Sequence, residues 1–389
     1  MFFLVKEMAK TLRLDAFLTN LDGLLRPICE KLQMSPSRHD EVEERYKYVG
    51  RWLRDCPRLS KYDLRIFPQG SYAIGTTLRP LSRCEFDLDF VLLLQKNWLL
   101  IEDAVDLLDM LEERLLSNGK YEGMVERKNR CLRLKYANDF HMDILPAIPN
   151  TIGSPSCLLV PDEKTQDWKH SNPEGFRDWF KNRSTERFDS LKQEPLPDYQ
   201  TLEQKSTLQC AVQLIKRWRD IYYNNRPNVA PVSIVLTTLA ARNYGGQTSV
   251  ETAVQSILDG ILREIYQIRQ GYRLTVFNPT NEQEDLSERW NTSESYKAFV
   301  DGIENFHSSW IKLCNLSGLD ERAEALKKLF GEQLTKEVMD ECAQYLASSR
   351  MGSMQGATST AGLIVTTSAK GSTPIQPHTF FGGSNDVAS

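Results

Sequence analysis

The sequence predicts an α+β fold in which a mixed sheet carrying paired acidic residues packs against a helical lobe. Residues 86–94 are apolar except for two aspartates near the start, which is typical of a buried strand. Residues 199–223 place apolar side chains three and four positions apart, which predicts a long spine helix between sheet and lobe. Helical patterns then continue to about residue 348, so strands concentrate in the first half of the chain.

The first half of the chain alternates between helical and strand patterns. Helices are expected over about residues 9–58, with an amphipathic stretch at 40–53, and over residues 101–117. Strands are expected at residues 64–67, 131–136 and 140–145, and Pro146 should end the last of them. Residues 151–197 are rich in Pro, Ser, Asn and Asp and include one aromatic helix near Phe176.

The second half reads as a series of helices followed by a tail. A helix should start at Pro231-Val232-Ser233, because proline suits the first turn of a helix. Further helices are expected over residues 250–267, 284–313 and 322–348. The tail is rich in Ser, Thr, Gly and Pro and should be mostly disordered, with an apolar docking segment at residues 377–382. The predicted parts are therefore a core lobe at 1–198, a helical lobe at 199–349 and a flexible tail at 350–389.

Composition sets limits on the class of protein. The 389 residues are 41% hydrophobic and carry a net charge of −4, which gives no basic field for long nucleic acid. No apolar run is long enough to predict a membrane span, and the short, early-charged N-terminus does not resemble a signal peptide. Eight cysteines without metal-ligand spacing are typical of reduced packing residues. We therefore expect a cytoplasmic protein without disulfides.

The most informative motif is a Gly-Ser turn that precedes two carboxylates. Gln69-Gly70-Ser71 follows a proline, and its backbone N–H groups and serine hydroxyl can donate to phosphate oxygens. Asp87 and Asp89 share one face of the following strand, because side chains alternate along a strand. Two carboxylates on one face repel each other unless a cation lies between them, and Mg²⁺ prefers such oxygen ligands. The motif predicts a site for a nucleoside triphosphate and metal.

A third carboxylate lies on a later strand. Asp143 follows a strand-turn-strand passage, so a hairpin could place it beside Asp87 and Asp89. Three carboxylates together would complete a site for two Mg²⁺ ions, with Mn²⁺ as the alternative.

These residues resemble the catalytic core of the DNA polymerase β-like nucleotidyltransferases. Within that superfamily the chain looks like the bacterial CD-NTases, which are relatives of cGAS and of the 2′-5′-oligoadenylate synthases. The resemblance covers about residues 1–330. It rests on Gln69–Leu94, Phe140–Pro149, Asn172–Phe176, Leu214–Asp220 with Pro231–Ser233, and Asn278-Pro279 ahead of Glu284–Trp290. The order of all these segments is far more specific than the Gly-Ser turn and acidic pair alone.

One departure leaves the metal pair open. The gap between Ser71 and Asp87 is longer than is usual in the family, and Glu85 precedes Asp87 by two residues. In cGAS-like members the pair is Glu-x-Asp, so Glu85 and Asp87 compete with Asp87 and Asp89. We favour Asp87 and Asp89, because the apolar run begins directly after Asp89 as in the oligoadenylate synthase pattern.

The resemblance implies roles for the site residues. Asp87 and Asp89 would hold both metal ions, and Asp143 would bind the metal that activates the acceptor hydroxyl or act as general base. Lys216 and Ser233 would contact the triphosphate of the donor, together with the Gly-Ser turn. The implied activity is synthesis of a cyclic di- or trinucleotide second messenger from ATP and/or GTP, with release of pyrophosphate, in CBASS anti-phage defence.

Three other hypotheses follow from the same features. A template-independent enzyme that makes linear oligoadenylate or modifies RNA would need the same core. A nucleotide-sensing module with an inactive core is the alternative from another class. The tail is expected to be a segment that a CBASS accessory protein binds or modifies.

Overall fold

The computed structural model describes residues 20–81, 86–101, 103–136, 140–152, 154–184, 197, 199–269, 271–290 and 292–351, and three short stretches beyond them. The expected helix that starts near residue 9 lies partly outside these residues. Glu85 and the docking segment expected at residues 377–382 lie wholly outside the described residues.

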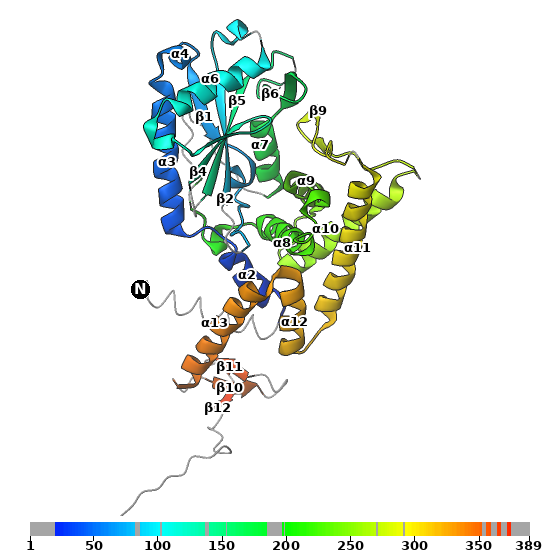
Figure 1. The fold of residues 1–389 in the computed structure, drawn as a ribbon. Helices are drawn as coiled ribbons and strands as arrows, with labels where there is room; N and C mark the ends of the chain where they lie inside the picture. The colour runs from blue at the N-terminus through cyan, green and yellow to red at the C-terminus, as the bar shows by residue number, and fades with distance from the viewer. Residues whose placement is uncertain are drawn as a thin grey trace, which may run out of the picture.

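A mixed sheet forms the first lobe, as the sequence predicted (Figure 1). Its main path runs β1-β2-β5-β4-β3. The strands are β1 Leu64–Pro68, β2 Phe86–Leu94, β3 Val125–Arg127, β4 Leu132–Tyr136 and β5 Phe140–Pro149. The central pair, β2 and β5, is parallel, and the pairs at β1–β2, β4–β5 and β3–β4 are antiparallel.

The alternation of side chains on β2 decides which face carries the acids. Leu88, Phe90 and Leu92 are buried against the helices α3 (Pro36–Arg54) and α6 (Ala104–Leu116). Asp87 and Asp89 alternate with these residues, so they lie on the opposite face of the sheet. The two helices therefore cover one face and leave the acidic face for the rest of the molecule.

The prediction that Pro146 ends its strand is wrong, because β5 continues to Pro149. The antiparallel pairing with β4 ends at Ile144, while the pairing with β2 continues to Ala147. One edge of β5 is therefore open at Pro146, and a residue without an N–H group is tolerated at an open edge.

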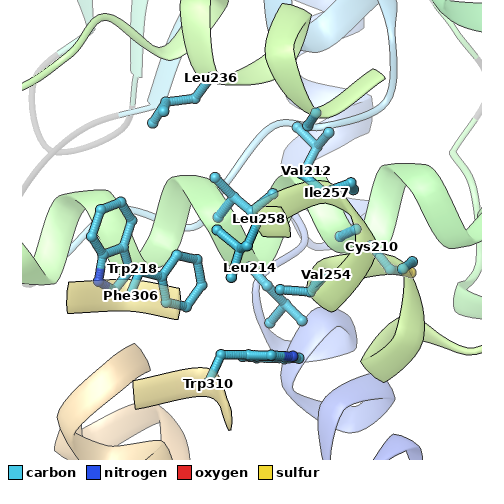
Figure 2. Packing of buried hydrophobic residues seen from close by; sticks show 14 of the residues in the cluster. Cys210, Val212, Leu214, Trp218, Leu236, Val254, Ile257, Leu258, Phe306 and Trp310 are labelled. Atoms are coloured by element: carbon cyan, nitrogen blue, oxygen red, sulfur yellow. The ribbon is translucent and has the colours of Figure 1, made fainter. Parts of the chain in front are cut away.

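A bundle of helices forms the second lobe around α8 (Thr207–Tyr222). Its other helices are α2 Asp22–Lys31, α7 Pro173–Arg183, α9 Ser233–Asn243, α10 Val250–Gln267, α11 Ser293–Asn315, α12 Leu319–Phe330 and α13 Glu332–Met351. Trp218 of α8 stacks on Phe306 of α11 with ring centroids 4.4 Å apart, and Leu214 and Ile257 belong to the same cluster of buried residues (Figure 2). Aromatic stacking and close packing thus fix α8 at the centre of the lobe.

Local sequence signals explain where α8 begins. Ser206 accepts a hydrogen bond from the Gln209 N–H, and the Gln209 side chain accepts one from the Ser206 N–H. This reciprocal capping box satisfies two backbone donors that a helix start otherwise leaves unpaired. The predicted long helix is therefore real but starts at Thr207, and a 3₁₀ turn at Leu202–Gln204 replaces its expected first residues.

Other predicted elements have different limits. The helix expected from residue 231 begins at Ser233, so Pro231 precedes it instead of occupying its first turn. Residues 284 and 285 end a short hairpin of β8 (Phe277–Asn278) and β9 (Asn281–Asp285). The helix expected at 322–348 is two helices that meet at Gly331, whose φ of +100° interrupts helical geometry.

Strands also occur where the sequence predicted none. The antiparallel pair β6 (Leu158–Asp162) and β7 (Asp167–Ser171) extends from the end of β5 inside the polar stretch. Short strands β10 (Gln355–Thr358), β11 (Ile364–Thr366) and β12 (Ser372–Pro374) pair within the tail, which was expected to be mostly disordered.

The hydrophobic cores do not divide the chain at a single point. The sheet and its helices enclose one core, whereas α2 and α7 contribute to the core of the helical lobe despite preceding residue 199. In the described part of the chain, no helix has the length and apolar character needed to cross a membrane.

Candidate active site

The Gly-Ser turn follows directly from the end of β1. Gly70 has a φ of +59° and starts the short helix α5 (Gly70–Ala73). The Gln69 N–H donates to the Asp89 carbonyl oxygen at 2.8 Å. A Cβ atom at Gly70 would lie 2.7 Å from Asp89 Oδ2. Both the backbone conformation and this close approach require glycine, and they hold the turn against Asp89.

The strand register brings the three predicted aspartates together. Asp89 on β2 lies directly beside Asp143 on β5, and Asp87 lies beside His141. The Asp87 side chain is 63% exposed, whereas that of Asp143 is 14% exposed and Asp89 is partly buried. The acidic cluster therefore extends from the surface into the interior.

Arg133 on β4 supplies a positive charge that the sequence analysis did not assign to the site. Its Nε and Nη2 donate to the two carboxylate oxygens of Asp143 at 2.7 and 2.8 Å. Nη2 also lies 3.3 Å from Asp87 Oδ1, and Nη1 lies 3.3 Å from His141 Nδ1. The signal was the alternation of apolar and basic residues at 131–136, which we read only as a half-buried strand.

The electrostatics of the cluster are dominated by Asp89. Burial and the neighbouring carboxylates of Asp143 and Asp87 raise the pKa of Asp89 to about 7, against the opposing effects of Arg133 and Lys216. Burial contributes most to this rise, and repulsion by the two neighbouring carboxylates adds to it. An additional cation would relieve the repulsion.

The donor set suits divalent metal ions by its chemistry. Three carboxylates on adjacent positions of two strands are the oxygen ligands that Mg²⁺ prefers. Among the described residues, however, no three acidic, histidine or cysteine side chains form a preassembled metal cage. In this structure both oxygens of Asp143 are paired with the guanidinium of Arg133. Binding of a metal ion by Asp143 would require that pairing to rearrange.

Lys216 lies at the junction between the two lobes. It is buried on α8, and its Nζ donates to the Thr76 carbonyl at 2.8 Å in the loop that follows the turn. Burial lowers the pKa of Lys216 to about 8, although Asp220 and Asp89 oppose the shift. The structure thus brings Lys216 into the electrostatic environment of Asp89, with its ammonium group on a backbone carbonyl.

The other two predicted phosphate contacts are placed differently. Ser71 Oγ lies 3.5 Å from Thr77 Oγ1, so the turn hydroxyl faces the same loop. Ser233 is the first residue of α9, and within the described residues no hydrogen bond joins its side chain to the turn or to the acids. Arg219 connects this helix start to α8 by donating to the Pro231 carbonyl at 2.9 Å.

Comparison with known proteins identifies the family. Residues 21–184 match the Second Messenger Oligonucleotide or Dinucleotide Synthetase domain. The chain is 32% identical over 376 residues to a c-di-GMP synthase of Roseivirga ehrenbergii, covering 94% of this chain and 98% of that protein. The chain belongs to this family of bacterial CD-NTases. It is a nucleotidyltransferase that makes cyclic oligonucleotides, as the motif order predicted.

Further relatives support the same assignment of the fold. The chain is 27% identical to the cyclic dinucleotide synthase CdnG of Bradyrhizobium diazoefficiens, covering 90% of each protein. The structure of that CD-NTase in complex with GTP matches with a TM-score of 0.71 at 24% identity, covering 84% of this chain and 100% of the other. Escherichia coli DncV in its 3′-deoxy GTP bound form matches with a TM-score of 0.61 at 18% identity, covering 83% and 97%. These likenesses confirm the polymerase β-like α+β fold.

Proposed function

We propose that this CD-NTase joins guanine nucleotides into a cyclic dinucleotide at the cluster formed by the Gly-Ser turn and Asp87, Asp89 and Asp143. The observation that carries the proposal is the register of β2 and β5, which sets Asp89 beside Asp143 and against Gly70. The choice of GTP follows from the c-di-GMP synthase that covers nearly the whole chain.

The residues of the site would have two roles, which are to stabilise charge and to orient the substrate. Two divalent ions bound to the carboxylates would lower the pKa of the attacking hydroxyl and neutralise the leaving pyrophosphate. The N–H groups of the turn and the Ser71 hydroxyl would orient the β- and γ-phosphates of the donor. Lys216 would add a positive charge to the triphosphate after leaving the Thr76 carbonyl.

The cellular role that fits this chemistry is second-messenger synthesis in the cytoplasm during CBASS defence. The cysteines of the described residues are all free, which is consistent with a reducing compartment. A solved relative, Escherichia coli CdnC, was captured with a HORMA protein. We extend from this the proposal that the tail of the present chain is recognised by an accessory protein.

Incubation of the protein with GTP and Mg²⁺, followed by phosphatase and mass spectrometry, tests the proposal. A phosphatase-resistant product with the mass of a cyclic dinucleotide is expected. Products that all lose their terminal phosphates would instead identify a linear oligonucleotide synthase, and no product would point to a nucleotide-binding module.

Single substitutions then resolve which carboxylates act. Asp89→Asn and Asp143→Asn should each reduce the rate by at least about a thousandfold, because each removes a charge needed in the transition state. Glu85→Gln should retain most activity, since Asp89 is the acid held against the turn. The exposed Asp340→Asn on α13 is the matched control. Loss of activity in Glu85→Gln with retention in Asp89→Asn would reverse the assignment of the metal pair.

A further inference from the structure

A cavity of about 310 Å³ lies between the end of α8 and the connection from β9 to α11. Its walls come from the 3₁₀ turn at Pro227–Val229, from the residues that precede α9, and from the segment around Trp290. Small-molecule sites begin at about 300 Å³, so the space suits a group such as a nucleobase.

The lining of this cavity combines positive charge with an aromatic wall. Arg219 and Arg289 both reach it, and no acidic side chain is among the lining residues that the structure describes. Trp290 also lines it, and its ring is fixed by Phe299 at 4.3 Å between centroids. Ala230 and Val232 contribute apolar surface. The cavity therefore offers hydrogen-bond donors to the edge of a flat ring, beside small apolar side chains and a tryptophan that is 4% exposed.

The two arginines differ in how they are held. Arg219 is fixed, because its Nε donates to the Pro231 carbonyl and its Nη1 to Asp220 at 2.7 Å. Arg289 is exposed, and within the described part of the chain it has no hydrogen bond or ion pair. Its planar fork of donors is therefore available to a ligand that presents two acceptors side by side.

The position of the cavity connects it to the proposed triphosphate contacts. Arg219 follows Lys216 by three residues on α8 and thus lies about one helical turn away on a neighbouring face. The charges of Arg219 and Lys216 influence each other, since Arg219 contributes to lowering the pKa of Lys216. Val232 directly precedes Ser233 at the start of α9. A nucleotide whose phosphates contact Lys216 and Ser233 would have this cavity beside it.

We propose that the cavity receives the guanine base of a substrate nucleotide and that Arg289 selects it by donating to O6 and N7. This inference rests on the proposed synthesis of a cyclic dinucleotide from GTP. Guanine presents two acceptors on this edge, whereas adenine presents one acceptor and one donor. An arginine donates only, so it matches guanine and leaves the adenine amino group opposite another donor.

Binding of two non-reactive nucleotides to the full chain tests the selection. The probes are α,β-methylene GTP and α,β-methylene ATP, measured by calorimetry in Mg²⁺. The wild-type protein should bind the guanine probe more tightly. Arg289→Met should weaken binding of the guanine probe by about 5- to 100-fold, because it removes a bidentate contact to the base. It should change the affinity for the adenine probe little. Arg263→Met, another exposed arginine of the helical lobe, is the control.

An atomic change in the ligand provides the second arm. The 7-deaza form of the guanine probe lacks N7, so it should lose affinity for the wild-type protein but not for Arg289→Met. Equal binding of both bases by the wild-type protein would overturn the proposal. Equal weakening of both probes in Arg289→Met would also overturn it, because Arg289 would then be contacting phosphate.

The selection and the synthesis can fail separately. A wild-type protein that prefers the guanine probe but forms no cyclic product from GTP would refute the synthesis and keep the base site. A protein that forms the cyclic product while Arg289→Met keeps its preference for the guanine probe would refute the base site alone.

Discussion

The ionised form of Asp89 is disfavoured in the folded protein. Its pKa is about 7 in the folded protein and 3.8 ordinarily, because burial, Asp143 and Asp87 oppose its ionisation. A raised carboxyl pKa stabilises the folded state fully below about pH 4, and this contribution is lost as the pH rises through 7.

Asp89→Asn should therefore remove a pH dependence of stability that wild-type protein shows in EDTA. Relative to the variant, the wild-type protein should lose about 2–4 kcal/mol of unfolding free energy between pH 4 and pH 8, at about 1.4 kcal/mol per pKa unit. Urea unfolding at several pH values measures it. Parallel pH curves for the two proteins would show that Asp89 ionises as easily in the folded state as in the unfolded one.

The turn requires glycine at position 70. Gly70→Ala places a side chain at a φ of +59° and a Cβ atom 2.7 Å from Asp89 Oδ2. We expect a loss of about 1–2 kcal/mol in stability and at least a tenfold loss in kcat/KM, because the turn must move from Asp89. Gly119→Ala, where a Cβ meets open space, should stay within about 0.5 kcal/mol of wild type. Similar activity in the two variants would refute this role of the turn.

At the scale of elements, the hairpin of β4 and β5 supplies a positive charge to the acidic cluster. Arg133 on β4 pairs with both oxygens of Asp143 on β5. The same oxygens would serve as metal ligands, so the guanidinium and a divalent ion compete for one carboxylate. The hairpin thereby places a positive charge beside Asp143 and Asp87 without a metal ion.

Arg133→Met should make the protein more dependent on divalent metal for its stability. In EDTA the variant should lose about 2 kcal/mol, because Asp143 is left without its charged partner. Mg²⁺ should raise its melting temperature more than that of wild type, as metal no longer displaces an arginine. Arg65→Met is the control, since it removes a bidentate pair with the single carboxylate of Glu174. An equal response to Mg²⁺ in all three proteins would show that Arg133 does not compete with metal.

The elements also show what could be predicted from the sequence. The strand at 86–94 and the helix at 250–267 have the predicted limits, because each carries its own periodicity and buried face. The strands β6, β7 and β9 were missed, since each has only five residues and none shows a regular alternation of apolar and polar side chains. Arg133 was missed for a different reason. Its role depends on the register that places it opposite Asp143, which a single strand does not reveal.

At the scale of the whole molecule, a row of hydrogen-bond donors joins the two lobes at the candidate active site. Five side chains on or just before α8 donate to backbone carbonyls of the loop that follows the Gly-Ser turn. They are Lys205 to Gly75, Gln209 to Ile74, Gln213 to Thr77, Lys216 to Thr76 and Arg217 to Arg79. The helical lobe therefore holds the loop that follows the Gly-Ser turn, and the two lobes together form the proposed catalytic unit.

This arrangement leaves the tail outside the catalytic unit but keeps α13 within it. Arg79 of the loop pairs with Glu337 of α13 at 2.8 Å, and Leu334 and Val338 of α13 are buried in the helical core. The strands β10 to β12 follow after Met351 and pair with one another (Figure 1). Removing residues after 351 should therefore spare the site, whereas removing α13 should not.

Truncation after Met351 should leave kcat/KM for GTP within about twofold and the melting temperature unchanged, because none of the proposed site residues lies beyond this point. Truncation after Gly331 should lower the melting temperature and the activity together, since it exposes the apolar side chains that α13 covers and removes the partner of Arg79. If the shorter tail deletion alone abolished synthesis with the melting temperature preserved, the tail would belong to the catalytic unit. The lobes would then not suffice for the reaction.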